Sequence, residues 1–99
     1  MTKVQYCKRG SDCCLSAVGH ATGSVEACAA VSAVMCGLSN YLRVHPIHVR
    51  EKIVDRITMA DAMVHAKGDA SLQAAFDMAA VTLASVAKGY HDFVEFEEI

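Results

Sequence analysis

The feature that most constrains this fold is a long helical repeat of apolar residues in the first half of the chain. Apolar side chains recur three or four positions apart and define one face, at Ala27, Val31, Val34, Leu38 and Leu42. Ser24 precedes this repeat as a candidate N-cap, and Pro46 disfavours helical geometry in His45. The sequence therefore predicts a helix that ends at about Arg43 and buries one face against a second layer.

A second helical repeat lies in the last third of the chain. Its apolar face is made of Leu72, Phe76, Ala79, Ala80, Leu83 and Val86. Asp69 or Ser71 can cap its start, and Gly89 fits its C-terminal cap. These residues predict a second helix with a buried face of small and medium side chains.

Short segments that alternate apolar and polar residues predict the strands. The predicted strands are 4–8, 14–18, 47–57, 59–67 and 92–97, with a turn at 10–12 between the first two. The order is β-β-α-β-β-α-β, which indicates an α+β fold with two helices packed on one mixed or antiparallel sheet. A length of 99 residues predicts a single domain, 1–99.

Composition narrows the possible partners. Apolar residues make up 54% of the chain and charged residues 20%, which excludes a disordered chain. The formal net charge is −2, so we expect no direct nucleic-acid partner. No uninterrupted apolar run approaches about 20 residues, so we expect no membrane partner. Residues 1–6 lack the apolar block of a signal peptide, and an odd number of cysteines, five, indicates free thiols in a reducing compartment. We therefore expect a cytoplasmic protein.

One histidine and one cysteine flank a short loop that contains glycine. His20 closes a predicted strand, and Cys28 follows eight positions later in the first turn of the predicted helix. An unperturbed thiol ionises near pH 8.5 or so, and both a helix N-terminus and a neighbouring histidine favour its thiolate. Free N–H groups at the helix start can stabilise an oxyanion. The spacing is typical of a nucleophile with its base, but a cysteine on an alanine-rich helix is also a common core residue.

Two linked segments carry a family resemblance. The chain has Gly-His-Ala at 19–21 and Cys-Ala-Ala-Val-Ser-Ala at 28–33. This arrangement resembles the ribosomal-processing cysteine protease family, Prp, in which a Gly-His-Ala motif, a loop and a Cys-Ala-x-x-Ser-Ala helix form the active site. The resemblance implies a small α+β cysteine protease with His20 as base and Cys28 as nucleophile. It places Gly19, Ala21 and Ser32 in the lining of the site, although a Ser32 hydroxyl bonded to its own helix backbone is equally consistent.

The resemblance also implies a protein substrate and a homodimer. Members of the family remove an N-terminal extension from large-subunit ribosomal protein twenty-seven. In this chain the loop between His20 and Cys28 is shorter than in the family, and Val-Glu-Ala at 25–27 stands where the family often has Asp-Ile-Val. This difference leaves open a phage structural protein as substrate. Glu26 is either a replacement for the missing acid or a solvated residue of the first helical turn. No cofactor and no metal ion are expected.

Two other functions remain open from the sequence. The short loop also fits an inactive protein-binding module of the same fold. A thiol redox protein would use Cys36 as a resolving cysteine, and a zinc protein would use the N-terminal cysteines with a histidine. The candidate zinc ligands are Cys7, Cys13, Cys14, His20 and His91. The candidates for a third catalytic residue that orients His20 are His45, His48 and His65.

Overall fold

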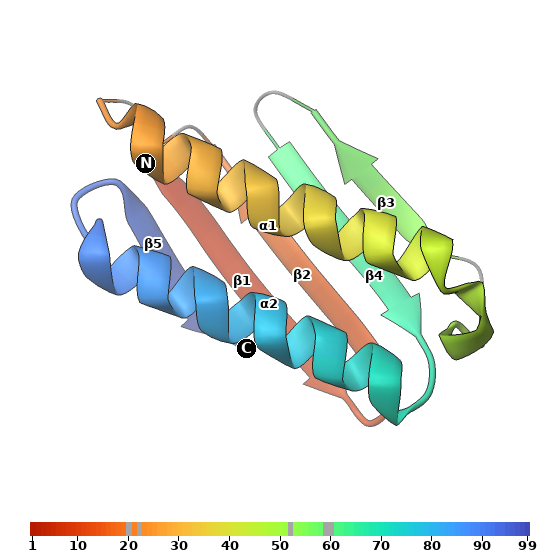
Figure 1. Cartoon of the computed structure of the whole chain (residues 1–99). Coiled ribbons are helices and arrows are strands. Elements are labelled where there is room, and N and C mark those ends of the chain that lie inside the picture. Colours follow the sequence, from red (N-terminus) through yellow and green to blue (C-terminus); the bar gives the residue numbers. More distant parts are fainter. Residues whose placement is uncertain (20, 22, 52, 59–60) are drawn as a thin grey trace.

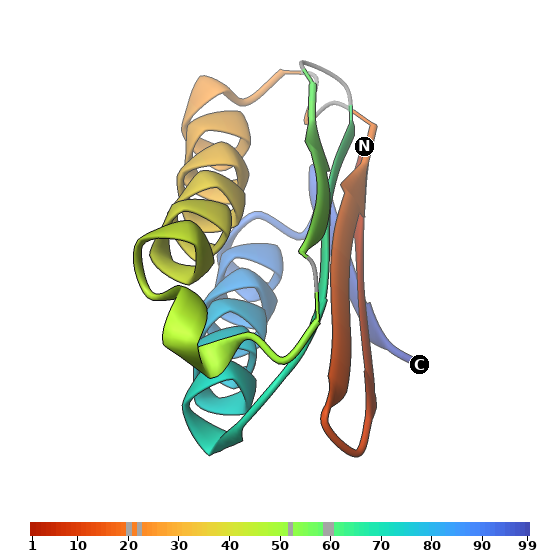
Figure 2. The ribbon, with the colours of Figure 1, turned by 90° about the vertical axis from the view of Figure 1, so that its right-hand side faces the viewer.

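The chain folds into two layers, a five-stranded sheet and two long helices on one of its faces (Figures 1 and 2). The computed structural model describes residues 1–19, 21, 23–51, 53–58 and 61–99. The elements are β1 (Thr2–Arg9), β2 (Asp12–Val18), α1 (Val25–Val44), the 3₁₀ helix η1 (Pro46–His48), β3 (Val54–Ile57), β4 (Asp61–Lys67), α2 (Ala70–Gly89) and β5 (Val94–Glu98). The predicted α+β class and the order β-β-α-β-β-α-β are confirmed.

The sheet is mixed, with the strand order β3-β4-β2-β1-β5. β5 pairs in parallel with β1, and the three other pairings are antiparallel. In the parallel pair Thr2 stands opposite Val94. The first and the last strand of the chain are therefore neighbours, and the start of β1 lies close to the segment that leads into β5.

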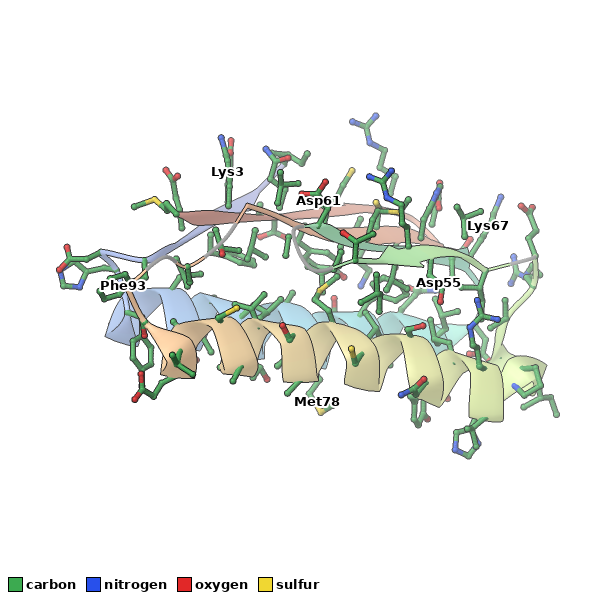
Figure 3. All side chains as sticks on the ribbon, turned by 90° about the horizontal axis from the view of Figure 1, so that it is seen from above. Lys3, Asp55, Asp61, Lys67, Met78 and Phe93 are labelled. Atoms are coloured by element: carbon green, nitrogen blue, oxygen red, sulfur yellow. The ribbon has the colours of Figure 1, made fainter. Side chains whose placement is uncertain are left out.

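The core lies between the helices and the facing side of the sheet. Its largest fully buried side chains are Phe76, Leu15, Met35, Leu42, Leu72, Leu83, Val4, Val64 and Val94. Burying one such side chain contributes about 1.5–3 kcal/mol. The opposite side of the sheet carries no helix, and Lys3, Asp61 and Lys67 project from it (Figure 3). We call this side the helix-free face.

Both helices begin at a side-chain cap. The Ser24 hydroxyl accepts a hydrogen bond from the N–H of Ala27 at 3.1 Å, which confirms the predicted cap of α1. At α2 the Asp69 carboxylate accepts from the N–H of Leu72 at 3.0 Å, so Asp69, not Ser71, is the cap. The prediction for Gly89 is wrong, because this residue is still helical and the C-cap is Tyr90.

The predicted strand 47–57 is wrong over its first half. Pro46 occupies the first turn of η1, a position where its fixed φ favours helical geometry, so Ile47 lies in a 3₁₀ turn. Val49 forms only an isolated bridge with Gly68, and β3 begins at Val54. β4 begins at Asp61; positions 59 and 60 of the predicted strand 59–67 lie outside the described residues.

Both helices have the length and composition of a membrane-spanning segment. Each has 20 residues and a mean hydropathy of 1.3 over its most apolar window. The core helices of soluble proteins pass the same test, so two such helices are weak evidence for a span. Here each helix packs one face against the sheet and fully buries a leucine, Leu42 in α1 and Leu83 in α2. The expectation that the chain has no membrane partner stays a prediction.

Candidate active site

The strand end that leads to the candidate site is held by the first residues of the chain. Gly19 has a φ of +90°, and a Cβ at this position would lie 2.6 Å from the carbonyl oxygen of Met1. The Thr2 hydroxyl donates to the carbonyl oxygen of Gly19 at 3.0 Å, and the Thr2 N–H donates to that of Phe93 at 2.9 Å. Only glycine fits position 19, because both the positive φ and the close approach exclude a side chain.

The described residues of the loop between Gly19 and α1, namely Ala21, Gly23 and Ser24, make uncharged contacts. Ala21 is buried, and its carbonyl oxygen accepts from the N–H of Ser24 at 3.1 Å. Gly23 has a φ of +96° and supports the Phe93 ring, whose nearest carbon would be 3.1 Å from a Cβ there. Phe93 lies beside the first turn of α1 (Figure 3). His20, the predicted base, lies outside the described residues.

A small cavity of about 40 Å³ lies between the first half of α1 and the sheet. Gly19, Cys28 and Ser32 all line it, so three of the predicted site residues are brought to one place. Ala21, predicted to line the site as well, does not line this cavity and is a buried part of the loop. The rest of the lining includes Thr2, Ala17, Met35 and Ile57. The sequence alone did not predict these four residues, because strand pairing and packing of α1 on the sheet, and not a local motif, bring them to the cavity.

Cys28 is the fourth residue of α1 and is partly buried. Its N–H donates to the carbonyl oxygen of Ser24 at 3.2 Å, and the N–H of Ala27 donates to the Ser24 hydroxyl. These two N–H groups are therefore committed to the cap. The N–H groups that remain available as the predicted oxyanion donors are those of the two preceding residues, Val25 and Glu26, because they have no acceptor within the helix.

Ser32 lies one helical turn after Cys28 and is exposed at the rim of the cavity. Its hydroxyl makes no hydrogen bond to any part of the chain that the structure describes, whereas two other helical hydroxyls do bond back to their helix. Thr82 donates to the carbonyl of Met78 at 2.8 Å and Ser85 to that of Val81 at 3.0 Å. The prediction that Ser32 lines the site is therefore favoured over a back-bonded hydroxyl.

The β3–β4 connection closes the other side of the cavity. Ile57 pairs with Ala62, and both side chains face α1. Asp61 lines the cavity too, but it pairs with Val18, and both side chains belong to the helix-free face (Figure 3). The Thr58 hydroxyl bonds the carbonyl oxygen and the N–H of Asp61, each at 3.0 Å. The Asp61 carboxylate therefore points away from Cys28.

The three histidines considered as a third catalytic residue lie elsewhere. His45 is the C-cap of α1, and a rise of 1.5 Å per residue puts it roughly 25 Å from Cys28 along the axis. His48 bonds Asp69 at 2.8 Å beyond that same end. His65 lies on the helix-free face, 2.6 Å from Asp12. The prediction that one of them orients His20 finds no support in this arrangement.

Two alternative functions use other cysteines, a redox role with Cys36 as resolving cysteine and a zinc site. Cys36 lies two turns further along α1, roughly 12 Å along the axis, whereas a disulfide requires Cα atoms within about 7 Å. A resolving role for Cys36 toward Cys28 is therefore wrong. Among residues 1–19, 21, 23–51, 53–58 and 61–99, no three His, Cys, Asp or Glu side chains are grouped so that they could hold a metal ion.

The far end of α1 is bonded to the sheet by charged groups. Asp55 of β3 accepts hydrogen bonds from the Ser39 hydroxyl and from the Arg43 guanidinium, the latter at 2.5 Å. The pKa of Asp55 is lowered; the hydrogen bond from Arg43 is the largest cause, and the hydrogen bond from Ser39 is the second. Asp55 projects between the layers (Figure 3). The side-chain link between this end of α1 and the sheet is therefore charged.

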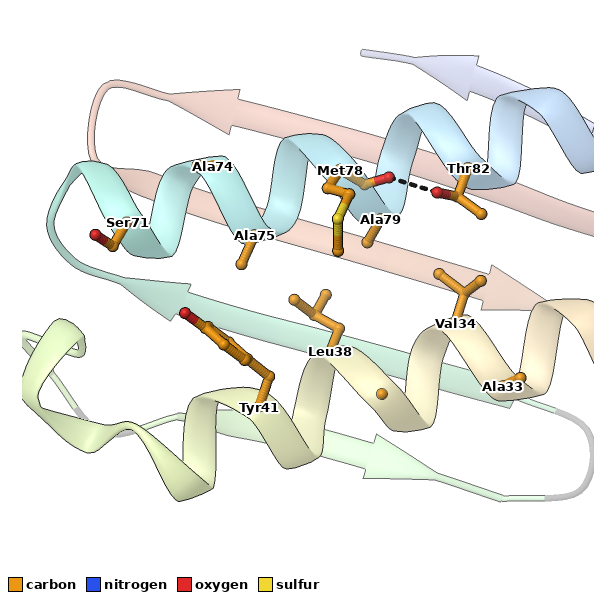
Figure 4. A pocket seen from close by; sticks show the side chains of 11 residues that line it. Ala33, Val34, Leu38, Tyr41, Ser71, Ala74, Ala75, Met78, Ala79 and Thr82 are labelled. Atoms are coloured by element: carbon orange, nitrogen blue, oxygen red, sulfur yellow. Dashed lines mark hydrogen bonds between the residues drawn. The ribbon is translucent and has the colours of Figure 1, made fainter.

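A larger groove of about 740 Å³ runs between α1 and α2 (Figure 4). Its lining is mostly apolar, with Leu38, Tyr41, Ala75 and Met78 among its residues, and it contains none of the described cysteines or histidines. Met78 is 70% exposed and lies on the outer side of the helix layer, away from the core. The groove is therefore separate from the cavity at Cys28.

The fold and the site define a class of protein, an α+β domain whose partly buried thiol lies at the start of a helix beside the end of a strand. Compared by sequence, the chain matches no protein-family model and no curated protein. Compared by structure, it is similar to SMU.848 from Streptococcus mutans (TM-score 0.83, 20% identity, 100% of this chain and 97% of the other).

Two further similar structures are of one protease. The ribosomal processing protease Prp from S. aureus, in complex with a covalently linked product peptide, matches with a TM-score of 0.82 at 16% identity. The same protease in complex with a substrate peptide matches with a TM-score of 0.75, also at 16% identity. Each match covers 100% of this chain and 100% of the protease chain. The chain described here therefore has the fold of Prp.

Proposed function

We propose that this chain is a cysteine peptidase of the ribosomal-processing type. The observation that carries the proposal is that Gly19, Cys28 and Ser32 line the same cavity at the start of α1. Solved structures with this fold include a protease that holds a covalently linked product peptide. His20 enters the proposal as the base because it directly follows Gly19 in the chain.

In the proposed mechanism, His20 takes the proton of the Cys28 thiol and the thiolate attacks the scissile carbonyl carbon. The N–H groups of Val25 and Glu26 are the proposed donors to the oxyanion. The C–N bond then breaks, and His20 returns the proton to the leaving amine. Water, deprotonated by His20, hydrolyses the thioester of the acyl-enzyme and restores the thiol.

The proposed substrate is a protein with an N-terminal extension. The resemblance at 19–21 and 28–33 favours large-subunit ribosomal protein twenty-seven, and the short loop keeps a phage structural protein as the alternative. We also propose that the protein is a single domain, that it acts as a homodimer and that it is cytoplasmic. The five cysteines are all free, as a reducing compartment would require.

The decisive test is cleavage of a peptide that spans such an N-terminal extension, with wild type and Cys28→Ala. We expect Cys28→Ala to lose at least about 10³-fold in rate, as nucleophile removal does in other proteases. Cys36→Ala is the matched control, because Cys36 is also a partly buried thiol of α1 but lies outside the cavity. Equal cleavage by wild type and Cys28→Ala would overturn the assignment of Cys28, and absence of cleavage by wild type would favour a binding module of this fold.

A second test addresses the Cys28–His20 pair directly. Alkylation of Cys28 by iodoacetamide, followed by peptide mass spectrometry, should proceed well below pH 8 in wild type. His20→Ala should slow it, whereas His91→Ala should not, because the His91 side chain is 79% exposed at the end of α2. If both variants react at the wild-type rate, His20 is not the base.

A further inference from the structure

A second pair of reactive groups lies on the side of the sheet opposite the helices. Cys7 of β1 and Cys14 of β2 stand directly opposite each other in the antiparallel pair. Their neighbours Tyr6 and Cys13 are buried under the helices, and side chains alternate along a strand. Both Cys7 and Cys14 therefore project from the helix-free face, and both are partly exposed.

The spacing of directly opposed residues suits a disulfide. Antiparallel partners have Cα atoms about 4.5–5.5 Å apart, which falls within the range of about 4.4–6.8 Å found in disulfides. Their Cβ atoms lie about 4.5–5.5 Å apart, slightly more than the 3.5–4.5 Å of a relaxed disulfide. The bond between Cys7 and Cys14 would therefore be slightly strained, and a strained disulfide is more easily reduced.

None of the other cysteines has this arrangement. Cys13 is fully buried and stands opposite Lys8, while Cys28 and Cys36 are two turns apart on α1. None of these three residues has a cysteine opposite it in a strand pair, and Cys13 faces the other side of the sheet from its neighbour Cys14. Cys7 and Cys14 are thus the one pair among the five cysteines that strand register places face to face.

The charges around the pair distinguish its two members. Arg9 lies two residues after Cys7 on the same face of β1, and its interaction with Cys7 raises the pKa of Arg9. Burial raises the pKa of the Cys14 thiol, and Cys7 raises it further. Arg9 places a positive charge beside Cys7, whereas the carboxylate of Asp12, opposite Arg9 in the strand pair, raises the pKa of Cys14. These features make Cys7 the attacking thiol and Cys14 the thiol that reacts second.

We propose that Cys7 and Cys14 form a thiol–disulfide exchange site on the helix-free face, which takes small anionic disulfides of the glutathione class. The site is separate from the cavity at Cys28, which α1 lines from the other side of the sheet, and does not depend on peptidase activity. In a reducing compartment the pair is a dithiol, and a rise in the concentration of oxidised glutathione converts it to a disulfide.

The exchange runs in two steps. The Cys7 thiolate attacks one sulfur of glutathione disulfide, the S–S bond of the reagent breaks, and one glutathione leaves as its thiolate. The Cys14 thiolate then attacks the Cys7 sulfur of this mixed disulfide, and the second glutathione leaves. The two protein thiols lose two electrons and two protons, and glutathione disulfide gains them to become two glutathione molecules.

The test is incubation of the folded full chain with oxidised glutathione, followed by intact mass and peptide mapping. In wild type we expect loss of two hydrogen atoms and a cross-link between residues 4–8 and the peptide that contains Cys14. The link should also form in Cys13→Ser, which would show that Cys14 and not the adjacent Cys13 is the partner of Cys7. It should form as well in the matched control Cys36→Ser. Dithiothreitol should reverse it.

Cys14→Ser gives the sharpest comparison, because it blocks only the second step. This variant should stop at a mixed disulfide and gain the mass of one glutathione on Cys7, whereas Cys7→Ser should form no link. The proposal is overturned if wild type accumulates the same glutathione adduct as Cys14→Ser, or if Cys7 in the folded protein does not react. Circular dichroism confirms that each variant is folded.

Discussion

The two ends of α1 are attached to the rest of the molecule by different kinds of interaction. At the C-terminal end, Asp55 binds Arg43 and Ser39 through a carboxylate. At the N-terminal end, the loop before Cys28 is held by the Thr2 hydroxyl and the Phe93 ring. One end is thus fixed by charge, and the other by neutral hydrogen bonds and close packing.

This difference suits a thiol that must ionise. A carboxylate beside a thiol disfavours its thiolate, whereas neutral anchors add no negative charge to the positive field of a helix N-terminus. In the described part of the cavity lining, the one carboxylate is that of Asp61, and it faces the other side of the sheet. Within the described lining, no carboxylate is therefore directed at the Cys28 thiol.

The largest effect is expected from Gly19→Ala, which disrupts the contact of Gly19 with Met1 and Thr2 at the N-terminal end of α1. The new Cβ would meet the Met1 carbonyl oxygen at 2.6 Å while the backbone keeps a φ of +90°. We expect a loss of at least about 2 kcal/mol in the free energy of unfolding, together with loss of peptide cleavage. Urea denaturation and the cleavage assay measure the two losses.

Gly37→Ala is the matched control, since Gly37 lies in α1 with nothing within 4 Å of an added Cβ. This change should stabilise the protein by about 0.5–1 kcal/mol, because alanine is the better helix former. A Gly19→Ala protein that is as stable and active as wild type would show that the loop does not need its tight contact with Met1.

The next largest effect is expected at the charged end of the helix. Asp55→Ala removes the acceptor of both Ser39 and Arg43 and should lower the free energy of unfolding by about 1–3 kcal/mol. The distance from Cys28 predicts that kcat stays near the wild-type value. A large fall in kcat at full folding would contradict the separation of the two ends.

The same carboxylate predicts a pH dependence. The pKa of Asp55 is lower in the folded state than in the unfolded state, so its contribution is present above about pH 4 and is lost as pH falls. In urea denaturation at pH 7 and pH 3, the difference in stability between wild type and Asp55→Asn should therefore shrink at the lower pH. A difference that is constant with pH would contradict an ionised Asp55.

Thr2→Val should have a smaller effect, directed at the site. It keeps the shape of the side chain but removes the donor to the Gly19 carbonyl oxygen, at a cost of about 1 kcal/mol. We expect kcat to fall more than KM rises, and Thr2→Ser to restore it. Thr82→Val is the control, because its hydroxyl bonds only to α2 on an exposed surface.

The smallest effect is expected from Glu26→Gln. Glu26 is exposed in the first turn of α1, and a carboxylate there contributes about 0.3–1 kcal/mol through the helix dipole. The rate of cleavage should therefore change by less than about fivefold. A fall of the size seen for Cys28→Ala would instead make Glu26 the replacement acid of the short loop.

Local patterns in the sequence predicted the local parts of the structure. The Ser24 cap and the helical spacing of Cys28 and Ser32 depend on residues at most one turn apart, and both are found as predicted. The strand predicted from Ile47 failed because alternation over a few residues was outweighed by the helical start at Pro46. Short apolar alternation without a turn motif does not define a strand.

The parts of the site that could not be predicted come from distant pairing. Thr2 and Phe93 reach the loop because β5 pairs in parallel with β1, and Ile57 reaches the cavity through its pairing with Ala62. Those registers depend on how all five strands share one core, which no local motif in the chain encodes.

The contact between Met1 and Gly19 has a practical consequence for anyone who expresses this protein. An affinity tag or fusion partner joined ahead of Met1 would begin within van der Waals reach of the loop that leads to Cys28. β5 runs in parallel with β1, from Val94 opposite Thr2 to Glu98 opposite Tyr6, so a tag joined after Ile99 leaves that loop uncovered. Purification handles therefore belong at the carboxyl terminus.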